Sequence, residues 1–199
     1  RDSKLERALI VTFALAELLV EGGERVGIPG LINPTASRSI IDRIAQAMLH
    51  DDAARPSLPP AFVPSPLAEI VVLSDFWSPI GDIRDMLAGL SSSGAHGTLI
   101  QIVDPAEESF PYSGRIEFVE PEGGEIIVAG RAESWASDYV ARVALHREQM
   151  RFETAKLDWL FSTHTTSRSA AELLLFLHSG MLASKSGGRA TSVKAGRGA

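Results

Sequence analysis

The chain has 199 residues, of which 45% are hydrophobic and 22% are charged, and its formal net charge is −6. This composition is typical of a folded globular protein, and the length suits one domain with a substantial core. Cysteine is absent, which excludes a disulfide framework, a thiolate zinc site and a cysteine nucleophile. The negative charge gives the chain no general attraction for nucleic acid, so we expect no nucleic-acid partner.

The N-terminal segment predicts a buried helix. Residues 3–21 contain strong helix formers and no breaker before Gly22. Their apolar stretch, residues 8–16, lies between Glu6 and Glu17 and is shorter than the roughly 20 residues that span a bilayer. We therefore expect no membrane span here, and no other stretch is a candidate.

Three further segments precede the centre of the chain. Residues 25–31 predict a short strand weakened by glycine and proline. Residues 37–49 predict an amphipathic helix, because their apolar side chains recur at helical spacing. Residues 51–68 contain five prolines and show no periodicity, so they predict a long irregular loop. That loop is either functional or a rigid surface connection.

The centre of the chain predicts a βαβ unit. Residues 69–75 and 98–104 are mostly apolar without alternation, as in strands covered on both faces, and each ends in an aspartate. Residues 79–90 predict a helix between them. Two such strands joined through a helix are parallel.

The C-terminal half adds a hairpin, helices and one more strand. Residues 115–129 alternate on either side of a turn rich in glycine, which is typical of a β-hairpin. Residues 133–157 predict an amphipathic helix with Trp135 and His146 on its apolar stripe. Residues 159–163 predict a strand, and the capping-box pattern at 169–172 predicts a helix to about Ala183.

Together these elements predict one α/β domain over residues 1–183. The expected architecture is a three-layer, Rossmann-like, mostly parallel sheet with helices on both faces and an inserted β-hairpin. Residues 184–199 hold four basic residues, no acid and many small residues, and predict a disordered basic tail. Such a tail either contacts phosphates or acidic lipids or is simply a solvated end.

The predicted sheet directs attention to its carboxyl edge, where ligands bind in open α/β folds. Ser74 and Asp75 lie at the end of one strand and Asp104 at the end of the next. The Asp75 carboxylate suits Mg²⁺, with hydroxyls completing the shell. Its alternative role is to cap the helix that starts near Pro79 or a turn before it.

The acids of residues 104–108 allow two interpretations, a metal or acid–base group and an ordinary solvated loop. The histidines show no metal-ligand spacing, and His146 is expected to be a core residue. The chain contains no phosphate-binding loop, no dinucleotide fingerprint and no nucleophile elbow. No complete catalytic constellation is therefore visible.

Several short motifs, in this order and spacing, resemble a known family over residues 3–183. The domain is similar to von Willebrand factor A-like domains, and in particular to the bacterial domain of unknown function fifty-eight. The motifs that carry this resemblance are Ser3–Ala8 leading to Gly23–Gly27, then Val71–Phe76, and then Val103–Glu107 followed by Pro111, Gly114 and the hairpin.

The resemblance implies a metal-ion-dependent adhesion site made of a D-x-S-x-S loop, a threonine on a second loop and an aspartate after the fourth strand. Asp75, with Ser74 beside it, matches the aspartate, while Thr35 and Ser57 are candidates for the hydroxyl ligand. Residues 2–6 do not fit D-x-S-x-S. We therefore expect Mg²⁺ in the intact protein but no tight binding by this chain.

The resemblance also implies that the chain begins after the metal loop or that its family has lost the site. The family's first strand is central in its sheet, so its absence would leave unpaired backbone. We expect a partner chain, a second copy forming a homo-oligomer, or a rearranged segment to cover that edge.

The leading functional hypothesis is a non-enzymatic protein-interaction module of the bacterial cytoplasm. The family resemblance implies a MoxR-type AAA+ ATPase as partner. One alternative is a metal-dependent phosphoryl hydrolase that uses Asp75 and Asp104 with Glu107. Another is a purely structural domain without a site.

Overall fold

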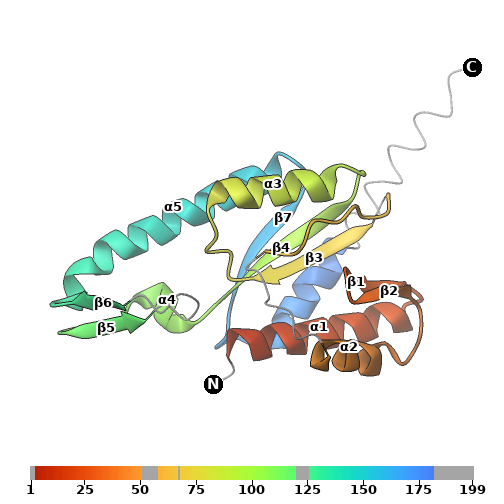
Figure 1. The fold of residues 1–199 in the computed structure, drawn as a ribbon, viewed down its shortest axis with the longest axis horizontal. Coiled ribbons are helices and arrows are strands. Elements are labelled where there is room, and N and C mark those ends of the chain that lie inside the picture. Colours follow the sequence, from red (N-terminus) through yellow and green to blue (C-terminus); the bar gives the residue numbers. More distant parts are fainter. Residues whose placement is uncertain (1–2, 51–57, 67, 120–125, 182–199) are drawn as a thin grey trace, which may run out of the picture.

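The computed structural model describes residues 3–50, 58–66, 68–119 and 126–181. Its centre is a three-stranded parallel sheet in the order β3-β4-β7, shown in Figure 1. These strands are β3 (Glu69–Ser74), β4 (His96–Val103) and β7 (Leu160–Thr165). The α/β class and the parallel βαβ unit are thus confirmed.

Helices cover both faces of this sheet. In Figure 1, α3 (Ile80–Ser91) and α5 (Ala136–Ala155) lie above it, while α1 (Lys4–Glu21) and a last helix, residues 170–181, lie below it. Each face has its own hydrophobic core. The lower core joins α1 and the last helix to β4, and the upper core joins α3 and α5 to the other face of the strands.

The central strand, β4, is buried on both faces, as its apolar sequence without alternation predicts. Ile100 and Ile102 belong to the lower core and Leu99 to the upper one, so both faces are buried. Gly97 has no space for a Cβ, which would overlap the Ile70 carbonyl oxygen and the Trp159 ring. Within the described residues, β3 pairs only with β4, and its side chains are half-buried.

The N-terminal region forms a separate two-stranded antiparallel sheet. It consists of β1 (Val26–Ile28) and β2 (Ile32–Thr35) and packs against α1 and α2 (Ile40–Leu49). The prediction of one strand over residues 25–31 is therefore corrected. The chain turns after Ile28, where Gly30 adopts φ 78°, a conformation that favours glycine.

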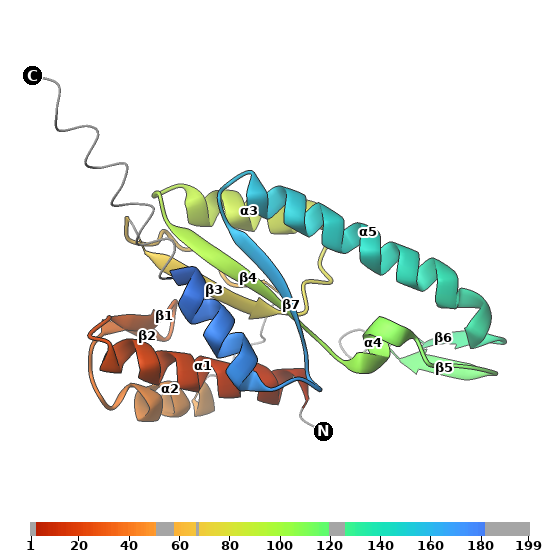
Figure 2. The ribbon, with the colours of Figure 1, turned by 180° about the vertical axis from the view of Figure 1, so that it is seen from behind.

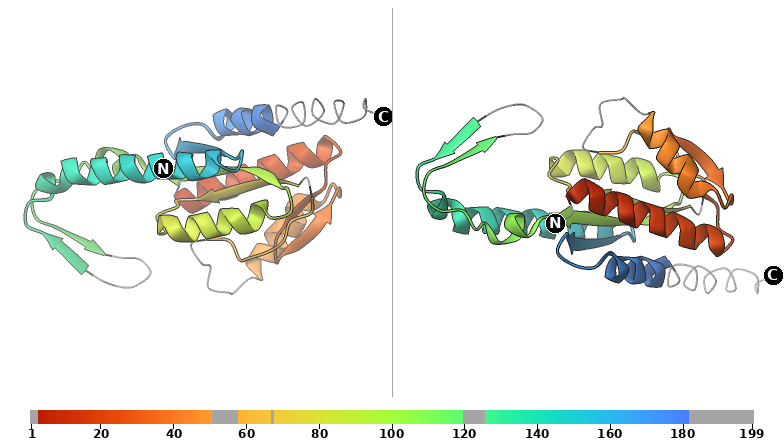
Figure 3. Two further views of the ribbon diagram at one scale, coloured as in Figure 1. Left: turned by 90° about the horizontal axis from the view of Figure 1, so that it is seen from above. Right: turned by 90° about the horizontal axis from the view of Figure 1, so that it is seen from below.

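A projecting arm extends beyond the carboxyl edge of the sheet, as Figures 1, 2 and 3 show. We define the arm as residues 105–139 of the described chain. It contains α4 (Pro105–Ser109), β5 (Ile116–Val119), β6 (Ile126–Ala129), the 3-10 helix η1 (Ala132–Trp135) and the start of α5. The β5–β6 hairpin is antiparallel as predicted. The long helix begins at Ala136, after η1, so Trp135 lies in the arm and is 41% exposed.

The last helix begins with only part of the predicted cap. The Ser169 hydroxyl accepts a hydrogen bond from the Ala171 N–H, as expected of an N-cap residue. The Glu172 carboxylate bonds to Arg168 instead. In the described chain, no helix is both long and apolar enough for a transmembrane segment.

Some predictions fall outside the described residues, namely the start of the irregular loop at 51–57, the hairpin turn at 121–124 and the tail at 184–199. Residues 58–66 form no helix or strand, as predicted. Within them, Leu58 and Phe62 pack against the upper core. This part of the loop is therefore fixed by apolar contacts.

Candidate functional site

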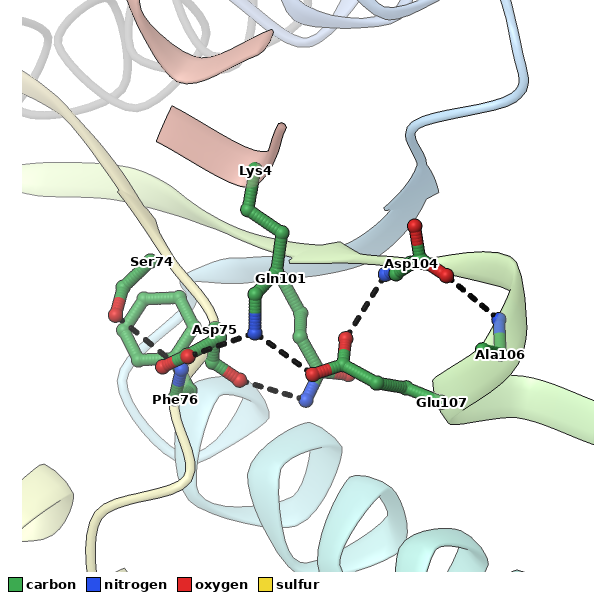
Figure 4. A network of polar contacts seen from close by, with 8 residues as sticks. All are labelled: Lys4, Ser74, Asp75, Phe76, Gln101, Asp104, Ala106 and Glu107. Atoms are coloured by element: carbon green, nitrogen blue, oxygen red, sulfur yellow. Dashed lines mark hydrogen bonds and ion pairs between the residues drawn. The ribbon is translucent and has the colours of Figure 1, made fainter. Parts of the chain in front are cut away.

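The carboxyl edge of the sheet carries a connected set of polar side chains, which we call the rim; Figure 4 shows part of it. The strands supply Ser74, Gln101 and Thr165, with Asp75 directly after β3 and Asp104 directly after β4. The helices α1, α4 and α5 add four charged side chains. The full set is Lys4, Ser74, Asp75, Gln101, Asp104, Glu107, Glu108, Arg147 and Thr165.

A lysine ammonium lies between two rim carboxylates. Lys4 is the first residue of α1, and its Nζ is 3.0 Å from Asp75 Oδ2 and 2.7 Å from Glu107 Oε1 (Figure 4). Burial by itself lowers the pKa of Lys4, but hydrogen bonds to Glu107 and Asp75, together with their charges, outweigh it, and the pKa is raised. The ammonium stays protonated. It neutralises these two carboxylates, which would otherwise be available to a bound cation.

Asp104 and Glu107 also have a local task, because they form the N-terminal cap of α4. The Ala106 N–H donates to Asp104 Oδ1 at 2.8 Å, and the Asp104 N–H donates to Glu107 Oε2 at 2.8 Å. This is a capping box with proline at the start of the helix. The acidic segment is therefore a short helix and not the loop of one sequence interpretation.

Gln101 connects the rim to α5. Its side chain is fully buried and donates to the Asp75 carbonyl oxygen at 2.9 Å. The Arg147 Nε donates to Gln101 Oε1 at 2.9 Å, and the guanidinium lies 3.5 Å from Glu108. Glu108 also accepts from the Thr165 hydroxyl at 3.1 Å. The rim is therefore a network in which each of these polar groups has a partner within the chain.

The remaining predicted ligands are placed as follows. The Ser74 hydroxyl accepts from the N–H of Phe76, a buried residue with φ 51°, and so supports the turn after β3. Asp75 does not cap α3, which begins at Ile80 after the N-cap residue Pro79 and has no side-chain cap. Thr35 lies in β2, at the other end of the molecule from the arm (Figure 1), and accepts from the Ser37 N–H. Ser57 lies outside the described residues.

His146 is the half-buried histidine that its position on α5 predicts. Its Nε2 lies 2.7 Å from the Phe76 carbonyl oxygen, and its ring packs on Trp77 at 5.7 Å between centroids. Across residues 3–50, 58–66, 68–119 and 126–181, no group of three or more His, Asp or Glu side chains is arranged to hold a metal ion. The rim geometry suits an internally neutralised structural network.

The arm carries a second candidate site, a cavity of about 320 Å³. Its walls are mainly aromatic, and Phe110 contacts the rings of Tyr112 and Tyr139 at 5.2 and 4.8 Å between centroids. Glu107 lies in one wall and links the cavity to the rim. The lining residues are Ala106, Glu107, Phe110, Tyr112, Phe118, Ile127, Trp135 and Tyr139. The sequence analysis did not identify this site.

Comparison with protein families matches residues 1–149 to the family described as "Protein of unknown function DUF58". The chain belongs to this family. The match covers α1, the N-terminal hairpin, β3, β4, the arm and most of α5 in this DUF58 member. No curated protein matches the chain, and no solved structure matches it. The family predicted from the short motifs is thus confirmed, and its description assigns no activity.

Proposed function

We propose that this DUF58 chain is a non-enzymatic protein-interaction module that binds its partner through the arm. The observation that carries this proposal is the exposed apolar surface of the hairpin. Val119, Ile126, Ile127 and Val128 are 47–61% exposed. Ile127 pairs with Phe118 on the face that lines the arm cavity with Trp135, and the other three lie on the opposite face of the hairpin. Exposed apolar side chains gathered on one hairpin in this way favour a binding site.

The rim supports a module that does not use a metal ion for binding. A divalent cation between Asp75 and Glu107 would have to displace the Lys4 ammonium, which both acids already hold. We therefore propose that Mg²⁺ binds this chain weakly at most.

The rival hydrolase would need Asp75, Asp104 and Glu107 as free acids around one ion or water. Asp75 and Glu107 instead hold Lys4, and Asp104 caps α4. A purely structural domain would have no reason to keep an apolar hairpin in solvent. These contacts favour the interaction module over both alternatives.

The proposed partner is a MoxR-type AAA+ ATPase of the bacterial cytoplasm, as the family resemblance implies. The test measures binding of such an ATPase, taken from the same genome, to the immobilised chain by biolayer interferometry. The nucleotide-free proteins are compared in Mg²⁺ and in EDTA. We expect micromolar binding that EDTA leaves unchanged.

Matched variants locate the binding surface. Ile127→Glu places a charge in the arm, and Leu175→Glu places one on the last helix, where Leu175 is 68% exposed. We expect the first to reduce binding at least tenfold and the second to leave it unchanged. Equal effects of the two variants would contradict the arm as the docking surface. Turnover of p-nitrophenyl phosphate that Asp75→Asn abolishes would favour the hydrolase.

A further inference from the structure

We propose that the arm cavity binds the side chain of an arginine from a basic segment of a partner protein. This inference rests on the proposed interaction function and names the chemistry that the arm recognises. Three features carry it: the aromatic walls of the cavity, the acidic residue Glu107 in one wall, and the acidic sequence of the segment that forms the cavity.

The aromatic walls suit a flat cation. Phe118 contacts Tyr112 at 5.3 Å and Trp135 at 6.2 Å between ring centroids, and the buried Phe110 also lines the cavity. Ring faces attract a guanidinium electrostatically, and its planar shape also allows stacking. A cavity of about 320 Å³ accommodates one such side chain with its apolar stem.

Glu107 is the charged residue in the cavity wall. One of its oxygens accepts from Lys4 and the other from the Asp104 N–H. An ionised carboxylate has about four acceptor positions, so it retains capacity for a further donor. Its charge is felt in the cavity, because the pKa of the Tyr139 hydroxyl is raised, first by burial and then by Glu107. Tyr139 therefore stays neutral.

The charge of the surrounding segment favours a basic partner. Residues 104–147 contain nine acidic residues against four arginines and no lysine. Lys4 offsets only part of this charge at the rim. Complementary charge of this kind accelerates association and selects the partner.

Arginine fits these features better than leucine or lysine. An apolar side chain would further desolvate Glu107 without giving it a donor, which is unfavourable. A lysine ammonium is more strongly hydrated and cannot stack on the rings as a guanidinium does. Arginine is therefore the proposed side chain, and the experiment compares it with lysine and leucine.

The experiment titrates three peptides into the full ¹⁵N-labelled chain and follows the Trp135 indole N–H by NMR. The peptides are acetyl-Gly-Ser-X-Ser-Gly-amide, in which X is arginine, lysine or leucine. Trp135→Phe assigns the signal. We expect the arginine peptide to shift it saturably with a Kd of about 1–10 mM. The lysine peptide should bind at least about threefold more weakly, and the leucine peptide should cause no saturable shift.

Variants separate charge from shape. Glu107→Gln should weaken the arginine peptide at least about fivefold, and Tyr112→Leu should do so without disturbing the contact to Lys4. Trp77→Phe, an exposed tryptophan outside the arm, serves as the control and should leave the affinity unchanged. A leucine peptide that binds as well as the arginine peptide overturns the proposal, and so does the absence of a shift with all three.

Failure here is distinguishable from failure of the proposed function. If the ATPase binds in a manner that depends on Ile127 while the arginine peptide does not bind, only the arginine assignment is wrong. If the arginine peptide binds while the ATPase does not, the cavity stands and the proposed partner is wrong.

Discussion

The rim and the arm adjoin each other and share Glu107, yet their side chains differ in how far they are satisfied by partners within the chain. In the rim, charged and polar groups hold one another, with Lys4 between two acids and Gln101 between a carbonyl and Arg147. In the arm, apolar side chains remain in solvent beside an open aromatic cavity. Conspicuous carboxylates at a strand end are thus compatible with a structural role, while the less conspicuous hairpin offers the uncovered surface.

The largest expected effect comes from the buried centre of the rim. Gln101→Leu keeps the volume but leaves the Asp75 carbonyl and the Arg147 Nε without their partner in a buried position. We expect the free energy of unfolding to fall by about 2–4 kcal/mol, measured by urea denaturation. Gln46→Leu, on the exposed face of α2, is the control and should change it by less than about 0.5 kcal/mol. Equal values would mean that Gln101 is not part of a stabilising network.

Lys4→Met should have a smaller effect, because the ammonium is about one-third exposed. Methionine preserves the apolar stem, so the loss reports the ion pairs with Asp75 and Glu107. We expect about 1 kcal/mol in the same denaturation assay, and less at high salt. Arg168→Met removes an exposed pair with Glu172 one turn away and should cost only about 0.3 kcal/mol. A stabilised Lys4→Met variant would contradict the neutralising role of Lys4.

A pH measurement tests a third polar position, His164 at the end of β7. Its pKa is lowered, first by burial and then by the charges of Arg7 and Arg168. The unfolded state therefore binds the proton more readily, and stability is lost as pH falls below about 6.5 toward the folded pKa. His164→Gln should flatten this part of the pH profile, whereas His178→Gln, on an exposed face, should keep it. A flat wild-type profile between pH 7 and 5 would show that His164 does not contribute.

The smallest expected effect on stability belongs to the arm. Ile127 is 52% exposed, so Ile127→Ser removes little buried area, and we expect a change below about 0.5 kcal/mol. Thermal unfolding at fixed pH checks this. A loss of about 2 kcal/mol would mean that the hairpin is packed in solution and does not offer a free surface.

The sequence was sufficient to predict β3, β4, the hairpin and the helices that cover the sheet, because unalternating apolar strands and helical periodicity are local signals. It missed β2, since Asn33 and Pro34 are poor strand formers and the antiparallel partner supplies the stability. It also missed α4, although Asp104-Pro105 followed by Glu107 is a recognisable capping-box pattern with proline at the first position.

The state of the candidate site was harder to predict than the fold. The strand-end position of Asp75 followed from the sheet, but its contact with Lys4 joins residues 71 positions apart in the sequence. No local pattern in the sequence indicates such a contact. The arm cavity could not be predicted for the same reason, because its rings come from the residues after α4, from β5, from η1 and from α5. The sequence also places Trp135 and Tyr139 on a helix stripe that resembles core.

The most direct test of the account is calorimetric titration of Mn²⁺ into the wild-type chain and into Lys4→Ser, with Asp75→Ala as a second background. We expect no binding at millimolar concentration by the wild type, and weak binding by Lys4→Ser that Asp75→Ala removes. Tight binding by the wild type that Asp75→Ala abolishes would contradict it, because Lys4 would then not be the cation that neutralises the rim.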